Sequence, residues 1–305
     1  MAKKPPSKRP PAKASSGRPA GLFTWLAVGL VVLVVAALVI IKVTSGSTAS
    51  TGSSTFQATD PATVSELTTV PASVFNTVSV ISPVAPVTPP QAISGQPALS
   101  ETVNGKKLPE VFYFGAEYCP FCAAQRWPTI IALSRFGTWS GLGNMTSSSQ
   151  DIDPNTPTFT FLKAKYTSPY IAFKSIEFET NVYDSATSSY TKLQTPTKTQ
   201  LALFRKYDTS TYIKGMPSSD NGSIPFMSIG NKFLVSGASF TPATLAGLSR
   251  TAIAQGLNTT SSPITAAIIA SANYLTASIC TLTNNQPSTV CTSPAVVAAK
   301  KIMKI

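Results

Sequence analysis

Cys119 and Cys122 are separated by two residues in the segment Cys-Pro-Phe-Cys. The thiolate is the nucleophile in disulfide exchange, so a reactive cysteine needs surroundings that stabilise negative charge. The N-terminus of a helix provides them through its free N–H groups and the positive end of its dipole. Two intervening residues let the second thiol meet the first across one helical turn. The spacing indicates a redox-active dithiol in which Cys119 is the exposed attacking sulfur and Cys122 resolves the intermediate.

The neighbouring residues favour such a helix. Residues 111–114 are an apolar run ended by Gly115, which is typical of a buried strand, and a helical period begins at Cys119. Pro120 suits the first helical turn because it has no N–H to leave without a partner. The helix dipole contributes about 1–2 kcal/mol, which predicts a moderately lowered pKa for Cys119. Glu117 would oppose that ionisation.

Two other interpretations of the motif are weaker. A zinc site needs further ligands, but the chain has no histidine, and Cys280 and Cys291 do not form a second Cys-x-x-Cys. A structural disulfide between Cys119 and Cys122 would close too short a loop to restrict the unfolded chain much. We therefore expect redox activity, with no metal and no other cofactor.

Residues 22–41 form an uncharged apolar run of about 30 Å as a helix, which matches the hydrocarbon core of a bilayer. A cleaved signal peptide is the alternative, but its apolar region is usually only about 7–15 residues long. Basic residues concentrate before the run and only Lys42 follows it closely, so the positive-inside rule places the N-terminus in the cytoplasm. We expect a single-pass membrane protein whose C-terminal domain is extracytoplasmic.

The formal net charge of +12 does not indicate a nucleic-acid partner. Half of it lies in the N-terminal tail, and the remaining basic residues are scattered. A nucleic-acid groove needs a basic stripe with interleaved aromatic residues.

Composition divides the chain into four parts. Within the third, Asp60 and Pro61 have the chemistry of an N-cap and a first helical position, which predicts a short helix up to Val70. The predicted parts are a basic cytoplasmic tail (1–20), a transmembrane anchor helix (21–42), a Ser/Thr/Pro-rich linker that is partly ordered (43–106), and a folded domain with a C-terminal helical, disulfide-bonded extension (107–305).

Strand-like and helix-like segments alternate in the fourth part, which indicates an α/β domain. The other strand candidates are residues 158–166, 171–180, 226–229 and 233–235. The other helix candidates are residues 197–207, 242–256 and 263–279.

Cys280 and Cys291 would form a disulfide outside the cytoplasm. Closing a loop of about ten residues would stabilise the fold by about 3 kcal/mol, so we expect a structural bond. The alternative is a second redox pair that relays electrons to Cys119 and Cys122.

Other side chains near the motif have less specific signals. Trp127 and Phe136 are expected to pack in the core rather than to contact a substrate. Glu177 or Glu179 could face the core near Cys122 and move protons, although a solvated strand face is the plainer interpretation.

Two features resemble the thioredoxin superfamily. The segment FGAEYCPFC (residues 114–122) is similar to that superfamily's junction between strand and active helix, and Ile224-Pro225 before residues 226–229 is similar to its cis-proline loop. The resemblance implies a thioredoxin-like fold in which Pro225 is the cis-proline and Ile224 flanks the substrate cleft, beside Pro120 and Phe121. The long separation between the motif and Pro225 adds an enlarged insertion.

More narrowly, four stretches resemble a mainly archaeal and actinobacterial membrane-anchored family of unknown function. The similarity covers residues 107–291 and brings no established substrate. The stretches are CPFCAAQRWPTIIALSRFG (119–137), DPNTPTFTF (153–161), IPFMSIGNKF (224–233) and SIC (278–280).

These observations predict an extracytoplasmic thiol-disulfide oxidoreductase that forms or isomerises disulfides in secreted or membrane proteins. Its partners would be protein thiols and disulfides and a membrane redox protein that resets the Cys119/Cys122 pair. The alternative is a non-catalytic membrane-anchored thioredoxin-like protein that binds surface proteins or helps to assemble them.

Overall fold

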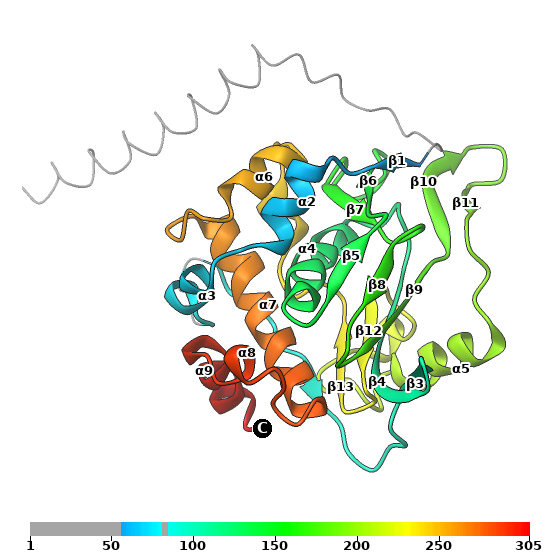
Figure 1. Ribbon diagram of the computed structural model, residues 1–305. Coiled ribbons are helices and arrows are strands. Elements are labelled where there is room, and N and C mark those ends of the chain that lie inside the picture. Colours follow the sequence, from blue (N-terminus) through cyan, green and yellow to red (C-terminus); the bar gives the residue numbers. More distant parts are fainter. Residues whose placement is uncertain (1–55, 81–84) are drawn as a thin grey trace, which may run out of the picture. The chain divides into compact units, whose positions relative to one another are not determined.

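The computed structural model describes residues 56–80 and 85–305 (Figure 1). The predicted cytoplasmic tail and anchor helix, residues 1–42, lie outside the described residues. The single-pass topology therefore stays a prediction.

The protein has a mixed α/β fold built on a central sheet, as the sequence predicts. Its middle strand is β4 (Lys106–Gly115), which pairs antiparallel with β12 (Phe226–Ile229) and parallel with β9 (Ala172–Glu177). The first residues of β4 form a hairpin with β3 (Ser100–Val103). Beyond β12 the sheet continues with β13 (Phe233–Ser236) and β2 (Gln91–Ala92).

Both faces of this sheet are covered, because successive side chains of β4 point to opposite faces and all of them are apolar or aromatic from Val111 to Phe114. Val111 and Tyr113 pack into the larger core cluster. Phe112 and Phe114 pack into a second cluster with Phe204.

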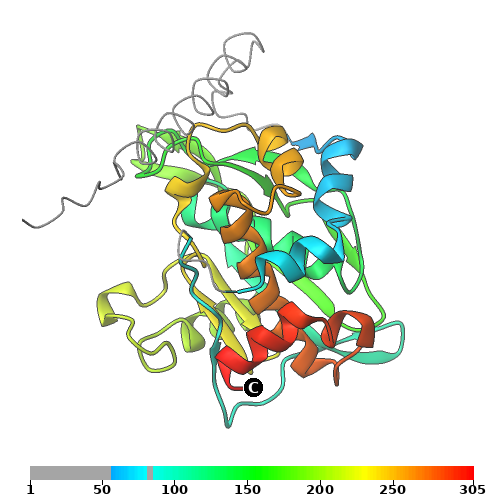
Figure 2. The ribbon, with the colours of Figure 1, turned by 90° about the vertical axis from the view of Figure 1, so that its left-hand side faces the viewer.

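Helices α4 (Pro120–Ser134) and α7 (Pro263–Leu282) pack together on the side of the larger cluster, and α5 (Lys198–Tyr207) covers the other face (Figure 1). Among the described residues, α7 is the one helix long and apolar enough to cross a membrane by length and composition. It is almost completely buried, with α3 (Ala72–Val78) and α9 (Pro294–Met303) against it (Figure 2). A core helix of the domain accounts for its composition.

The long stretch between α4 and β12 holds extra strands around the central sheet. The hairpin of β10 (Glu179–Asp184) and β11 (Ser189–Lys192) follows β9 directly. The strands between α4 and β9 are β5 (Thr138–Ser140), β6 (Gly143–Thr146), β7 (Pro157–Thr160) and β8 (Lys165–Thr167). The remaining elements are β1 (Gln57–Ala58), α2 (Pro61–Thr68), η1 (Ser218–Asp220), η2 (Pro242–Leu245), α6 (Arg250–Gly256) and α8 (Ser288–Cys291).

The predicted domain boundary at residue 107 is wrong. Leu67 and Phe75 are buried in the main core, β1 pairs with β6, and the side chain of Asn273 donates a hydrogen bond to the Phe75 carbonyl at 3.0 Å. These apolar residues are spaced by prolines and small polar residues, so no long periodic pattern marks them. The folded domain includes the described residues from Phe56 onward.

Element boundaries follow the predictions where the apolar period is long. Helix α2 begins after Asp60, whose carboxylate accepts the N–H of Thr63, as predicted. The predicted strands 158–166 and 171–180 each divide into two, and the predicted helix 242–256 divides into η2 and α6. The divisions occur where the backbone leaves the sheet or turns between two helices.

Candidate functional site

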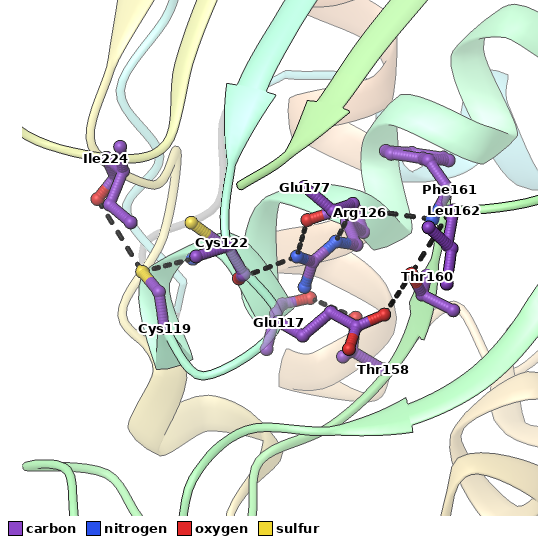
Figure 3. A network of polar contacts seen from close by, with 12 residues as sticks. Glu117, Cys119, Cys122, Arg126, Thr158, Thr160, Phe161, Leu162, Glu177 and Ile224 are labelled. Atoms are coloured by element: carbon purple, nitrogen blue, oxygen red, sulfur yellow. Dashed lines mark hydrogen bonds and ion pairs between the residues drawn. The ribbon is translucent and has the colours of Figure 1, made fainter. Parts of the chain in front are cut away.

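Cys119 is the N-cap of α4, in the turn that follows β4. Its Sγ accepts the N–H of Cys122 at 3.1 Å, and its thiol lies 3.7 Å from the carbonyl oxygen of Ile224 (Figure 3). The helix begins here because Pro120 occupies its first position, and an N-cap side chain satisfies a backbone N–H that would lack a partner. The strand-to-helix geometry predicted for the motif is present.

Cys122 lies one turn further into α4 and is fully buried. Neither cysteine of the motif forms a disulfide in the described chain. Cys119 is only 4% exposed, so the prediction of an exposed attacking sulfur is wrong. Next to it in the motif, Phe121 reaches the surface, with 38% of its area exposed.

The predicted direction of the Cys119 pKa is also wrong. Burial raises the pKa of the Cys119 thiol well above its ordinary value, and the adjacent Cys122 adds to the increase. The N–H of Cys122 and the charge of Arg126 lower the pKa by less. The helix N-terminus therefore does not compensate for the loss of solvent around the sulfur.

The loop before β12 lies against the motif. The Ile224–Pro225 peptide bond is cis, as the resemblance implied. Ile224 is half-buried beside Cys119, whereas Pro225 and Pro120 are buried. The structure therefore brings Ile224 and Cys119 together, and it leaves Phe121 and Ile224 as the predicted substrate-binding residues that solvent reaches.

A buried ion pair supports the motif from inside the protein (Figure 3). Arg126 donates from Nε to one oxygen of Glu177 at 2.9 Å and from Nη2 to the other at 2.5 Å, and both side chains are fully buried. Nη2 also donates to the Ala116 carbonyl at 2.7 Å. The pair therefore connects α4, β9 and the end of β4.

Glu117 forms a second buried carboxyl next to this pair. It accepts a hydrogen bond from the Thr160 hydroxyl at 2.6 Å. Burial raises the pKa of Glu117 to about 7, because the loss of solvent outweighs that hydrogen bond. A carboxyl with this pKa exchanges protons near neutral pH.

Comparison with known proteins identifies the family. A family model described as a domain of unknown function, DUF929, matches residues 98–281. The chain belongs to this family. No curated protein and no solved structure matches it.

The DUF929 match contains the whole candidate site, from β3 to residue 281 in the last turn of α7, including both cysteines of the motif and the Ile224 loop. It begins before residue 107, in agreement with the earlier start of the fold. The description of this family assigns no activity.

In this DUF929 protein the C-terminal cysteines form the predicted Cys280–Cys291 disulfide, which joins the end of α7 to α8. Trp127 and Phe136 are buried core residues, as predicted. Glu177 faces the core rather than solvent, which corrects the plainer interpretation of its strand.

Arg126 was not among the predicted site residues, although the sequence carries one signal for it. Arg126 is the one charged residue between Cys119 and Ser134, in a helix that is otherwise apolar or neutral. A lone charge in such a helix indicates a buried partner.

A cavity of about 400 Å³ near Tyr118, the residue before the motif, was also not predicted. Its lining includes residues 148–150 and part of β10, and the N–H of Ser148 donates to the Tyr118 carbonyl at 2.8 Å. The Tyr118 ring stacks on Tyr190 of β11 at 4.0 Å. These residues lie in the inserted strands, whose pairing the motif does not specify.

Proposed function

We propose that this protein is an extracytoplasmic thiol-disulfide oxidoreductase with a thioredoxin-like fold, held by one membrane anchor. Cys119 is the sulfur that exchanges with substrate, and Cys122 is the resolving sulfur. The observation that carries the proposal is the Cys119 Sγ at the N-cap of α4, in contact with the N–H of Cys122 one turn deeper.

The sheet supports the thioredoxin-like assignment. Strands β4 and β9 are parallel and α4 lies between them in the chain, while β12 and β13 form an antiparallel hairpin on the other side of β4. This order places the start of α4 beside the Ile224 loop, and the contact between Cys119 and Ile224 follows from it.

The proposed reaction begins with the Cys119–Cys122 disulfide. A substrate thiolate attacks Cys119 Sγ, which forms a mixed disulfide and releases Cys122 as a thiolate. A second substrate thiolate then attacks the substrate sulfur of that bond, which completes the substrate disulfide and releases the Cys119 thiolate. Two electrons pass to the cysteine pair, and a membrane redox protein with a disulfide or quinone oxidant removes them.

Access to Cys119 requires movement, because its sulfur is covered in the described arrangement. Phe121 and Ile224 are two partly exposed residues next to it. A substrate segment would displace them, and the cavity beside Tyr118 offers space for the polypeptide that flanks the reacting cysteine.

The buried sulfur favours a second candidate. A non-catalytic membrane-anchored thioredoxin-like protein that binds or helps to assemble surface proteins would keep the motif covered, as observed for Cys119. Its raised pKa also slows attack at neutral pH.

Thiol trapping separates the two candidates. The full-length Cys122→Ala variant is incubated with a small secreted protein in its disulfide-bonded form, and covalent complexes are detected by non-reducing electrophoresis. We expect a complex that reducing agent dissolves and that the Cys119→Ala/Cys122→Ala control does not form. Absence of the complex, together with a reduction potential of a buried structural bond for the Cys119/Cys122 couple, would support the binding function.

A further inference from the structure

The hydroxyl of Tyr113 is a buried donor next to the redox motif. Tyr113 lies on β4, its side chain is fully buried, and among the described residues its hydroxyl has no hydrogen-bond partner. Leaving a buried hydroxyl without a partner costs about 1–3 kcal/mol. Because the hydroxyl is retained despite this cost, we expect another state of the protein in which it gains a hydrogen-bond partner.

Gly115 shows how close this hydroxyl lies to Cys122. A Cβ atom at Gly115 would lie 2.5 Å from the Tyr113 Oη and 3.0 Å from the Cys122 Sγ. The hydroxyl and the sulfur are therefore at most 5.5 Å apart, the sum of 2.5 and 3.0 Å. Any larger residue at position 115 would overlap both groups, so glycine leaves the space between them open.

A second donor lies on the same inner side of the motif. Arg126 follows Cys122 by one helical turn, and its Cζ lies 5.7 Å from the centre of the Tyr113 ring. In the part of the chain that the structure describes, its Nη1 has no hydrogen-bond partner, because Glu177 and Ala116 engage Nε and Nη2. The charges of Arg126 and Glu177 act on Tyr113, and the Glu117 carboxyl lies next to that pair.

We propose that Tyr113 is a further residue of the redox site, whose hydroxyl donates a hydrogen bond to the Cys122 thiolate. The inference rests on the proposed oxidoreductase function. A neutral thiol is a weak acceptor, so the hydroxyl gains a strong partner only when Cys122 becomes charged.

The proposed reaction produces that charge. Attack of a substrate thiolate on Cys119 breaks the Cys119–Cys122 bond and leaves the electron pair on the Cys122 sulfur. In the opposite direction the Cys122 thiolate attacks Cys119 of the mixed disulfide and releases the substrate thiolate. Tyr113 keeps its own proton in both directions, because burial raises its pKa well above the ordinary value.

The direct test compares the Cys122 thiolate in full-length Cys119→Ala and in full-length Cys119→Ala/Tyr113→Phe. Thiolate is measured by its ultraviolet absorbance as pH is raised. A hydrogen bond to a charged group changes an equilibrium by about tenfold to a hundredfold, so the thiolate-to-thiol ratio at a given pH should fall by that factor. Superimposable curves would overturn the role of Tyr113, whether or not the protein is an enzyme.

A kinetic experiment tests whether this hydrogen bond affects the proposed reaction. Reduced full-length protein is mixed with oxidised glutathione, and the lifetime of the mixed disulfide on Cys119 is measured. In Tyr113→Phe this lifetime should lengthen about tenfold at neutral pH and approach that of the unmodified protein at high pH. An unchanged pH profile would contradict the proposal.

The matched control is Tyr274→Phe. Tyr274 is also buried, and its hydroxyl donates to the Val80 carbonyl at 3.3 Å in another part of the core. It should change neither the titration nor the lifetime. If no variant forms a mixed disulfide, the oxidoreductase proposal fails, and the titration still decides whether Tyr113 bonds to Cys122.

Discussion

Arg126 and Glu177 form a two-point ion pair behind the turn that carries Cys119 and Cys122. The pair joins the active helix to the parallel strand β9, and Arg126 also holds the carbonyl of Ala116 just before the motif. A residue three positions before Cys119 and a residue seven positions after it are therefore fixed to one another. This contact fixes the position of the start of α4 relative to the sheet.

Replacing Glu177 by Gln should strongly destabilise the protein. The change leaves the Arg126 charge buried without a counter-ion, which costs about 3–5 kcal/mol in the free energy of unfolding. Urea unfolding of the full-length chain measures the loss. The double variant Arg126→Met/Glu177→Leu should recover most of it, because two apolar side chains leave no buried charge. Equal losses in the single and double variants would show that packing, not charge, holds the site.

Glu117 should make stability fall as pH rises from about 4.5 to about 7. Below this range the carboxyl is protonated in the folded and unfolded chain. Within it only the folded chain keeps the proton, so the free energy of unfolding decreases with pH. The increase in the Glu117 pKa from 4.5 to about 7 on folding corresponds to about 3 kcal/mol in the free energy of unfolding.

Glu117→Gln should remove this contribution while keeping an acceptor for Thr160. The variant should match the unmodified protein at about pH 4 and exceed its stability at about pH 8 by up to about 3 kcal/mol. Urea unfolding at both pH values tests this, with Glu66→Gln as a control outside the site. Parallel pH curves for the two proteins would mean that Glu117 is ionised in the folded state.

Cys119 should react slowly with iodoacetamide at neutral pH. Its pKa is raised by burial, so the thiolate that reacts forms only at alkaline pH, and the rate should keep rising above about pH 9. The measurement uses the Cys122→Ala variant, so that a single motif cysteine reacts, and the urea-unfolded protein gives the reference rate. A rate at about pH 7 equal to that of the unfolded chain would show that the covered arrangement does not persist in solution.

The sequence predicted the parts of the site that follow from local rules. Cys119 and Pro120 carry the chemistry of an N-cap and a first helical residue, and the apolar run of β4 identifies the strand before them. The position of the Ile224 loop beside the motif was predicted from the resemblance to the thioredoxin superfamily, not from the composition of the loop.

The remaining features of the site depend on contacts between segments far apart in the chain. Cys119 is buried, with its sulfur against the carbonyl of Ile224, more than a hundred residues away in the sequence, so the local helix dipole predicted the wrong direction for its pKa. Arg126 and Glu177 meet only because β4 and β9 pair in parallel. The Tyr113 hydroxyl, which has no hydrogen-bond partner among the described residues, lies where a side chain at Gly115 would overlap it, and no periodic pattern indicates this arrangement.

The Cys280–Cys291 disulfide should contribute to stability and not to redox chemistry. It closes a loop with a sequence separation of 11 residues, for which the chain-entropy model gives about 3 kcal/mol. Both cysteines are buried, so thiol reagents and substrate thiols reach them poorly. Cys280→Ala/Cys291→Ala should therefore unfold at lower urea concentration, while its Cys119/Cys122 pair keeps its reduction potential and its reaction with oxidised glutathione. A change in that potential, or loss of turnover with stability preserved, would instead assign the C-terminal pair a role as an electron relay.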